Sequence, residues 1–219
     1  KFTNGLAKWL ESQGVTFKLG QPVTDLHARE DGVHVECGGE ERFDGVVISA
    51  GVASRKFAQM LGDHVNVYPV KGYSITVNLD DEASQAAAPM VSLLDDKAKI
   101  VTSRLGKTRF RVAGTAEFNG ENRDILERRV RPLVQWSEEH FPDVSTENCV
   151  PWAGLRPMMP NMMPRVGRGK HERVFYNTGH GHLGWTLCAA TSDIVGDAVQ
   201  GQFASENKAF PGGLDLQTA

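Results

Sequence analysis

This chain of 219 residues has 40% hydrophobic and 23% charged residues, a composition typical of an ordinary globular protein with one or two domains. Its net charge of −3 argues against nucleic acid as the main partner. It shows neither an apolar run near the ~20 residues of a membrane-spanning helix nor a signal peptide, so we expect a cytoplasmic protein, either free or peripheral at the inner membrane.

The first part of the chain predicts a helix followed by short strands. Residues 3–13 have helical spacing of apolar side chains, and Gly14 can end the helix. Turn residues then recur at Glu30-Asp31-Gly32 and at Gly38-Gly39, with strand-like segments on either side. We expect strands over 15–19, 22–28 and 33–37, and toward Phe43.

A continuous apolar run, Val46-Val47-Ile48, is expected of an interior strand that is buried on both faces of a mainly parallel sheet. The strand ends in Ser49-Ala50-Gly51, and a helix to residue 61 should follow. Small residues at this end of a strand indicate a place where a ligand approaches an open α/β sheet. A close-packed turn from strand to helix is the commoner explanation of the same pattern.

The middle of the chain predicts a separate antiparallel sheet, because longer strands alternate there with turn residues. We expect its strands over 65–79, 90–94, 99–104 and 109–117. A helix over 122–140 should follow, with Pro132 either kinking it or starting a new segment.

The last third predicts further strands, a stiff loop and a final helix. The strands are expected over 150–156, 165–167 and 174–177, and three prolines stiffen the loop 157–164. A helix is expected over 184–199, and its buried face should be formed by Leu187, Ile194, Val195 and Ala198. Beyond Gly201 the pattern is lost, which predicts a frayed tail.

The cysteines and histidines give no metal signal. Cys37, Cys149 and Cys188 are far apart and odd in number, so we expect small buried residues in a reducing compartment. His180 and His182 lack a nearby third ligand, and we predict no metal site. The methionines of the proline-rich loop are expected to form a soft pocket wall or to fill the core.

Two motifs carry chemistry. Arg156 precedes a proline, which favours an extended backbone, and its planar guanidinium can hold a carboxylate through two hydrogen bonds. A structural ion pair is the commoner role of such an arginine. The loop 179–184 contains three glycines before the last helix, whose free N–H groups suit an anionic or electron-rich ligand; a tight turn without ligand is equally consistent. Tyr73 either roofs a pocket or packs in the core.

These motifs resemble the D-amino-acid oxidase and glycine oxidase family of FAD-dependent oxidoreductases, and within it the C-terminal half of the small subunit of D-amino-acid dehydrogenase. The resemblance extends along nearly the whole chain. The matching segments are Phe2-Thr3-Asn4-Gly5-Leu6-Ala7, Pro22-Val23, Val47-Ile48-Ser49-Ala50-Gly51, Tyr68-Pro69-Val70-Lys71-Gly72-Tyr73-Ser74, Trp152-Ala153-Gly154-Leu155-Arg156-Pro157 and Asn177-Thr178-Gly179-His180-Gly181-His182-Leu183-Gly184-Trp185-Thr186.

The resemblance implies a mixed α/β and α+β fold: part of a Rossmann-like FAD-binding domain and an antiparallel-sheet substrate domain. The expected divisions are a partial FAD domain over 1–62, the substrate domain over 63–150, a returning FAD-domain segment over 151–202 and a tail over 203–219. The chain would then be a C-terminal fragment that lacks the dinucleotide-binding Gly-x-Gly-x-x-Gly, and it should bind FAD poorly and be inactive by itself.

The resemblance also implies site residues. Arg156 would bind the substrate carboxylate, and His182 and Tyr73 would contact the substrate. FAD would be held by Val23, Ala50, Gly51, His180, Gly181, His182, Leu183, Gly184, Trp185 and Thr186. The implied activity is oxidative deamination of D-amino acids, with hydride transfer from the α-carbon to the flavin and no catalytic acid or base.

The electron acceptor could be a quinone, another carrier or oxygen. Two alternatives remain open. One is another amine- or imino-acid-oxidising flavoenzyme, such as a hydroxyproline dehydrogenase. The other is a non-catalytic assembly subunit.

Overall fold

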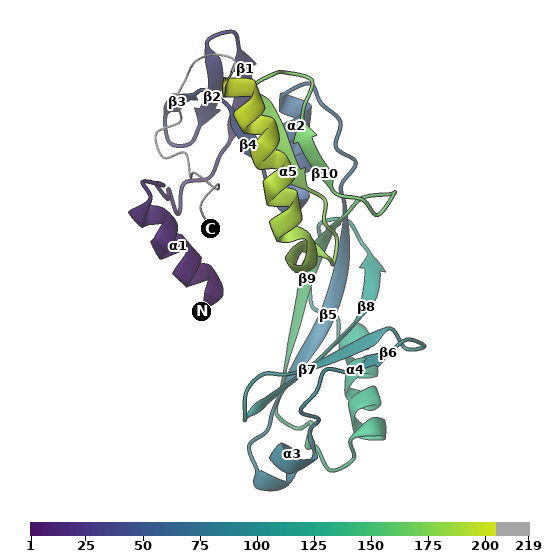
Figure 1. Cartoon of the computed structure of the whole chain (residues 1–219). Helices are drawn as coiled ribbons and strands as arrows, with labels where there is room; N and C mark the ends of the chain where they lie inside the picture. Colours follow the sequence, from purple (N-terminus) through teal and green to yellow (C-terminus); the bar gives the residue numbers. More distant parts are fainter. Residues whose placement is uncertain (205–219) are drawn as a thin grey trace. The chain divides into compact units, whose positions relative to one another are not determined.

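The computed structural model describes residues 1–204, which form two compact units. Among the described residues, the first unit contains 1–66, 164–178 and 183–204, and the second contains 67–163 and 179–182. No helix of the described residues is both long and apolar enough to cross a membrane. The antiparallel sheet and the mixed helix and strand content that the sequence predicts are confirmed (Figure 1).

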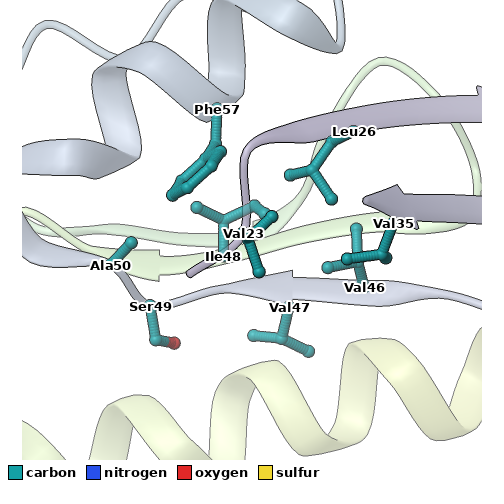
Figure 2. A pocket seen from close by; sticks show the side chains of 9 residues that line it. All are labelled: Val23, Leu26, Val35, Val46, Val47, Ile48, Ser49, Ala50 and Phe57. Carbon is teal, nitrogen blue, oxygen red and sulfur yellow. The ribbon is translucent and has the colours of Figure 1, made fainter. Parts of the chain in front are cut away.

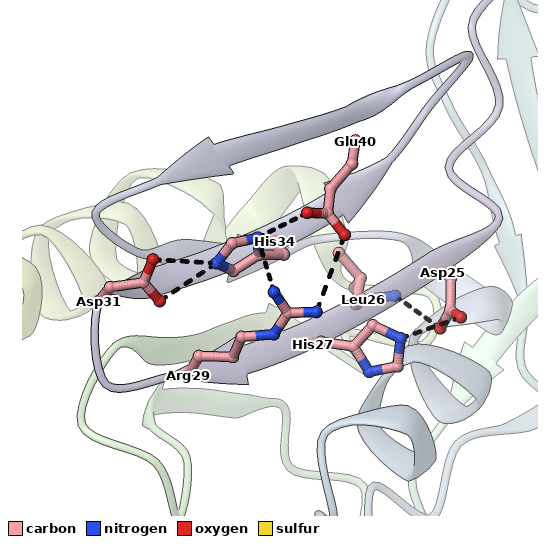
Figure 3. A network of polar contacts seen from close by, with 7 residues as sticks. All are labelled: Asp25, Leu26, His27, Arg29, Asp31, His34 and Glu40. Carbon is pink, nitrogen blue, oxygen red and sulfur yellow. Dashed lines mark hydrogen bonds and ion pairs between the residues drawn. The ribbon is translucent and has the colours of Figure 1, made fainter.

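The first unit begins with helix α1 (Phe2–Ser12) and a meander of β1 (Asp25–Arg29), β2 (Gly32–Glu36) and β3 (Glu40–Phe43). A polar cluster ties the meander together (Figure 3): the His34 ring lies 3.1 Å from carboxylate oxygens of both Asp31 and Glu40. The hydrogen bond to His34 lowers the pKa of Asp31. The strand predicted over 15–19 does not form.

The first unit also contains a mixed three-stranded sheet in the order β10 (Arg165–Arg168), β11 (Val174–Thr178), β4 (Val46–Ile48), in which β10 and β11 are antiparallel. Strands β11 and β4 are parallel, as the apolar run predicts, but β4 lies at the edge. Val47 is therefore 41% exposed, because within residues 1–204 no strand pairs with the free edge of β4. The prediction of an interior strand buried on both faces is wrong for this chain.

Two helices pack against the strands of this sheet. After β4 come the 3-10 turn η1 (Gly51–Ala53) and α2 (Ser54–Met60), and the last helix, α5, spans Gly184–Ala204. Its buried side is formed by Val195 and Phe203, which pack on Phe175 of β11. Two details of the prediction are wrong: Ile194 is 55% exposed, and the helix continues beyond Gly201 because Phe203 is anchored in the core. The remainder of the predicted tail, 205–219, lies outside the described residues.

The second unit is built on a five-stranded antiparallel sheet. Its order is β6 (Leu94–Asp95), β7 (Ile100–Arg104), β8 (Arg109–Phe118), β5 (Tyr68–Asn78) and β9 (Cys149–Met158). Residues 151–163, predicted to return to the first domain, belong to this unit because β9 pairs with β5 along its whole length. Apart from β6, residues 90–94 form no strand.

Two helices accompany this sheet. Helix α3 (Glu82–Ala87) was not predicted; Asp81 caps it by accepting a 2.7 Å hydrogen bond from the backbone N–H of Ser84. Helix α4 (Glu127–His140) begins five residues later than predicted and includes Pro132. Its Leu133 packs on one face of the sheet with Ile75 and Phe110. The side chains of β5 therefore alternate between this core and the opposite face.

The cysteines differ in their surroundings. All three are free thiols, but only Cys37 is buried, while Cys149 is half-buried and Cys188 is exposed. The expectation of three buried residues is wrong for the last two. Burial raises the pKa of Cys149.

Candidate functional site

The predicted carboxylate-binding residue, Arg156, lies on the sheet face of the second unit that is turned away from α4. It sits on β9 directly opposite Val70 of β5, and its guanidinium extends over Gly72. A Cβ at position 72 would lie 1.8 Å from Nη1 of Arg156, far inside any tolerated contact. The absence of a side chain at position 72 therefore leaves the space that the guanidinium occupies.

A second glycine extends this surface. Gly154 is the register partner of Gly72, so both face the same side. The indole ring of Trp152 lies over Gly154, where a Cβ would approach its Cη2 to 2.2 Å. The two glycines form a floor without side chains of its own, on which a guanidinium and an aromatic ring lie. We use the name glycine floor for Gly72 and Gly154 together with the two side chains that cover them, those of Trp152 and Arg156.

The surroundings of Arg156 disfavour a structural ion pair. Among residues 1–204, no carboxylate forms an ion pair with its guanidinium, although the residue is only partly exposed. Burial lowers the pKa of Arg156, and the neighbouring charge of Arg111 lowers it further. A partly desolvated cation without an acidic partner is suited to binding an anionic ligand.

The glycine-rich loop reaches the end of this strand. The backbone N–H of Gly181 donates a 2.9 Å hydrogen bond to the carbonyl of Pro157, and His180 forms a β-bridge with Met158. Gly181 has a φ of +58°, and a Cβ there would meet the sulfur of Met158 at 2.6 Å. The two chemistry-bearing motifs of the sequence therefore meet, and burial lowers the pKa of His180.

The remaining residues of the predicted flavin segment are mostly open to solvent. His182 and Thr186 are exposed, as are Leu183 (40%) and Trp185 (71%). Helix α5 starts at Gly184, so its first N–H groups follow directly on this loop.

A cavity of about 270 Å³ in the first unit contains two of the other predicted cofactor residues, Val23 and Ala50 (Figure 2). Its other lining residues are mostly apolar: Leu26, Val35, Val46, Val47, Ile48, Ser49 and Phe57. Gly51 is not among them. The Ser54 and Thr178 hydroxyls, 2.7 Å apart and buried, join the start of α2 to the end of β11.

Tyr73, the third predicted substrate contact, does not face the glycine floor. It is 1% exposed and packs in the core under α4, and its hydroxyl donates a 2.7 Å hydrogen bond to Glu117. The physical reason is strand alternation: Tyr73 is one residue from Gly72, so it points to the opposite face. The packing alternative for this residue is the one that the structure supports.

Glu117 anchors the buried polar cluster around Tyr73. Lys71, which is fully buried, lies opposite it on β5 with its Nζ 2.8 Å from Oε2 of Glu117. The hydrogen bonds from Lys71 and Tyr73 stabilise the ionised carboxylate and lower its pKa from 4.5 to about 2. The cluster neutralises a cation inside the second unit.

We predict that Glu117→Gln lowers the melting temperature at pH 7 by roughly 5 °C or more, because Lys71 is left buried without its counter-charge. The stabilisation from ionised Glu117 is complete above pH 4.5 and is lost as pH falls toward 2, since the unfolded chain takes up the proton first. Thermal melts across this range should show a smaller pH dependence for the variant than for the wild type. Glu121→Gln, at an exposed position, is the control and should melt with the pH dependence of the wild type. An equal pH dependence of the melting temperature in Glu117→Gln and the wild type would contradict the role of Glu117.

Comparison with known proteins identifies the family to which this chain is similar. The model for FAD dependent oxidoreductases matches residues 1–198. The chain is 57% identical over 204 residues to D-amino acid dehydrogenase 3 of Mesorhizobium japonicum, and 40% identical over 205 residues to a D-amino acid dehydrogenase of Paramagnetospirillum magneticum. These alignments cover 91% and 92% of this chain but 49% and 48% of the relatives, so the chain spans about half their length.

A solved structure shows the same fold. Glycine oxidase from Geobacillus kaustophilus superposes with a TM-score of 0.72 at 22% sequence identity, covering 87% of this chain and 49% of that enzyme. The family match covers most of the chain, and the sequence resemblance is confirmed by it. The chain therefore belongs to the FAD-dependent oxidoreductase family.

Proposed function

We propose that this chain contributes the substrate-binding sheet and part of the FAD site of an enzyme that oxidatively deaminates D-amino acids. The observation that carries the proposal is the guanidinium of Arg156, which lies over Gly72 without an acidic partner in the described residues. The high identity to proteins named D-amino acid dehydrogenase supports the choice of substrate class.

The residues of the first unit fit part of an FAD molecule. The apolar cavity at the end of β4 has the size and lining for an adenosine-like group, with Val23 and Ala50 as contacts. The loop from His180 to Thr186 leads into the α5 N-terminus, whose N–H groups favour an electron-rich ring edge. When bound, FAD would supply the two-electron acceptor for the α-hydrogen.

The protein side of the reaction is mainly positioning. Arg156 would hold the substrate carboxylate through two parallel hydrogen bonds, which fixes the direction of the α-hydrogen. The amino acid loses a hydride and a proton to become an imino acid, and water then converts the imino acid into a 2-oxo acid and ammonia. This scheme requires no general base at the α-carbon, because the amine would bind neutral and the α-hydrogen would leave as a hydride. The final electron acceptor would be a quinone, another carrier or oxygen.

Activity of the full-length protein, meaning a polypeptide that contains this chain and has the length of its relatives, tests the proposal. We expect it to carry FAD and to reduce an artificial electron acceptor with D-amino acids, releasing one 2-oxo acid for each two electrons. The L-enantiomers should react at least about tenfold more slowly, because Arg156 fixes the orientation of the α-hydrogen. Equal rates with both enantiomers, or a protein without flavin, would overturn the proposal. Faster oxidation of a hydroxyproline than of any acyclic D-amino acid would show that the substrate is an imino acid, as in the hydroxyproline dehydrogenase alternative.

A further inference from the structure

A second arginine lies on the same sheet face as the glycine floor. Arg111 of β8 pairs with Thr76 of β5, but its Nη2 donates a 3.1 Å hydrogen bond to the hydroxyl of Ser74. Ser74 is two residues nearer to Gly72 than Thr76 is, so Arg111 leans toward Arg156. Its guanidinium also lies 5.4 Å from the ring centre of Trp152.

Neither arginine is neutralised. Within residues 1–204 no carboxylate forms an ion pair with Arg111 or Arg156. Burial lowers the pKa of Arg156, and the positive charge of Arg111 lowers it further. The opposite face of the same sheet is different, because there the buried Lys71 has Glu117 as its counter-charge. Two like charges, partly desolvated and unpaired, create a strong potential for anions on the floor side.

The spacing of the two cations suits one small ligand. Arg156 covers Gly72 and Arg111 contacts Ser74, and these two residues are separated by about 6.6 Å along an extended strand. A short dicarboxylic acid spans that distance. Arg111 and Trp152 also line a cavity of about 510 Å³, which offers room for a substrate side chain beside the floor.

We propose that Arg111 binds a second carboxylate, so that the site takes amino dicarboxylic acids such as D-aspartate and D-glutamate. The inference rests on the proposed function for the role of Arg156. The α-carboxylate would lie on Arg156 and the side-chain carboxylate on Arg111, with the Trp152 ring between them. Arg111 is then a residue that determines specificity, and it takes no part in the oxidation.

A competing direction for the side chain exists on the same face. Tyr68, Phe118 and Met158 line an apolar hollow of about 450 Å³ beyond Arg156, on the side away from Arg111. An apolar side chain would occupy that hollow, with no contact to Arg111. Preference for D-leucine or D-phenylalanine over the acidic substrates would therefore overturn the inference.

Binding of simple carboxylates to the full 219-residue chain tests the anion pair without FAD. Titration calorimetry with succinate and glutarate, compared with butyrate, should give at least about tenfold tighter binding of the dicarboxylates, since one more charge-assisted hydrogen-bonded contact is made. Higher salt should reduce the difference. Equal affinity for mono- and dicarboxylates would overturn the inference.

Variants assign the preference to Arg111. Arg111→Gln should remove most of the dicarboxylate preference, because it weakens the binding of succinate and glutarate far more than that of butyrate. Arg111→Lys should retain part of the preference because the charge remains but the fork is lost. Arg131→Gln, an exposed position on α4, makes the same charge change elsewhere in the unit and should alter nothing. An unchanged preference in a folded Arg111→Gln or Arg111→Lys chain would contradict the role.

Kinetics of the full-length protein separate this inference from the proposed function. We expect Arg111→Gln to lower kcat/KM for D-aspartate or D-glutamate about tenfold or more, with D-alanine affected far less. Oxidation of D-alanine without any preference for acidic substrates would leave the proposed function intact and overturn the inference. Dicarboxylate preference in binding without oxidation of any D-amino acid would support the anion pair and overturn the proposed function.

Discussion

Arg156→Lys in the full-length protein is expected to lower kcat/KM for D-amino acids by about ten- to hundredfold while the FAD content stays unchanged. Lysine keeps the charge but lacks the planar fork, so a carboxylate can be attracted and no longer oriented. Loss of one charge-assisted hydrogen bond costs about 1.5–3 kcal/mol, which corresponds to that range in rate constant. A misdirected α-hydrogen should add a loss in kcat.

The measurement is steady-state kinetics beside flavin absorbance and a thermal melt. An arginine of purely structural importance would lower the melting temperature and the flavin content and leave substrate-specific parameters alone. Arg131→Lys on the exposed side of α4 is the matched control, because the substitution is the same and α4 packs on the face of the sheet opposite to Arg156. Unchanged kcat/KM in fully flavin-loaded Arg156→Lys would remove this residue from the substrate site.

The sequence marked the two motifs of the candidate site more clearly than the other residues that surround them. The Arg156-Pro157 pair and the glycine loop are recognisable without coordinates, and the structure joins them through the Gly181 to Pro157 hydrogen bond. The face of the sheet on which Tyr73 lies could not be predicted. One face of the strand is buried and the other is functional, and the alternation of side chains is the same whichever face is the functional one. The structure shows the face, because Tyr73 packs in the core with Leu133 of α4 while Arg156 covers the neighbouring Gly72.

Gly72, Trp152 and Arg111 were missed as site residues for the same reason. Gly72 and Trp152 stand in the recognised motifs, but the importance of Gly72 comes from the side chain of Arg156 on the neighbouring strand, 84 positions along the chain. Arg111 lies on a third strand, and no local pattern marks it. A signal was nevertheless present: two glycines in strands of otherwise large residues indicate a place where something approaches the backbone closely.

The error at Val47 has another cause. A continuous apolar strand is expected to have neighbours on both edges, but whether it does depends on which other strands are present. Here β4 pairs only with β11 among the described residues. The apolar run predicted the type of sheet correctly and could not predict the number of neighbours. Short elements such as α3 are missed because one capping aspartate is a weak signal by itself.

Gly72→Ala should impair the enzyme without harming the fold. The added Cβ would lie 1.8 Å from Nη1 and 2.1 Å from Cζ of Arg156, atoms at the far end of a flexible side chain. The guanidinium therefore moves off the floor, while the φ of Gly72 lies outside the left-handed region, so the strand accepts alanine. A displacement of about 1 Å at a positioning residue can cost about 100-fold in rate. We expect kcat/KM to fall about ten- to hundredfold with an unchanged or higher melting temperature.

The double variant gives the sharpest test of this assignment. If Gly72 acts only by leaving space for the guanidinium of Arg156, then Arg156→Lys should add little to the loss that Gly72→Ala already causes, because both changes remove the same oriented contact. Kinetics of the wild type, the two single variants and the double variant complete the cycle. Gly196→Ala on α5, where a Cβ would meet no atom within 4 Å, controls for a glycine-to-alanine change in general. Losses that simply multiply in the double variant would show that Gly72 and Arg156 act independently, and the glycine floor would then not be the site that holds the carboxylate.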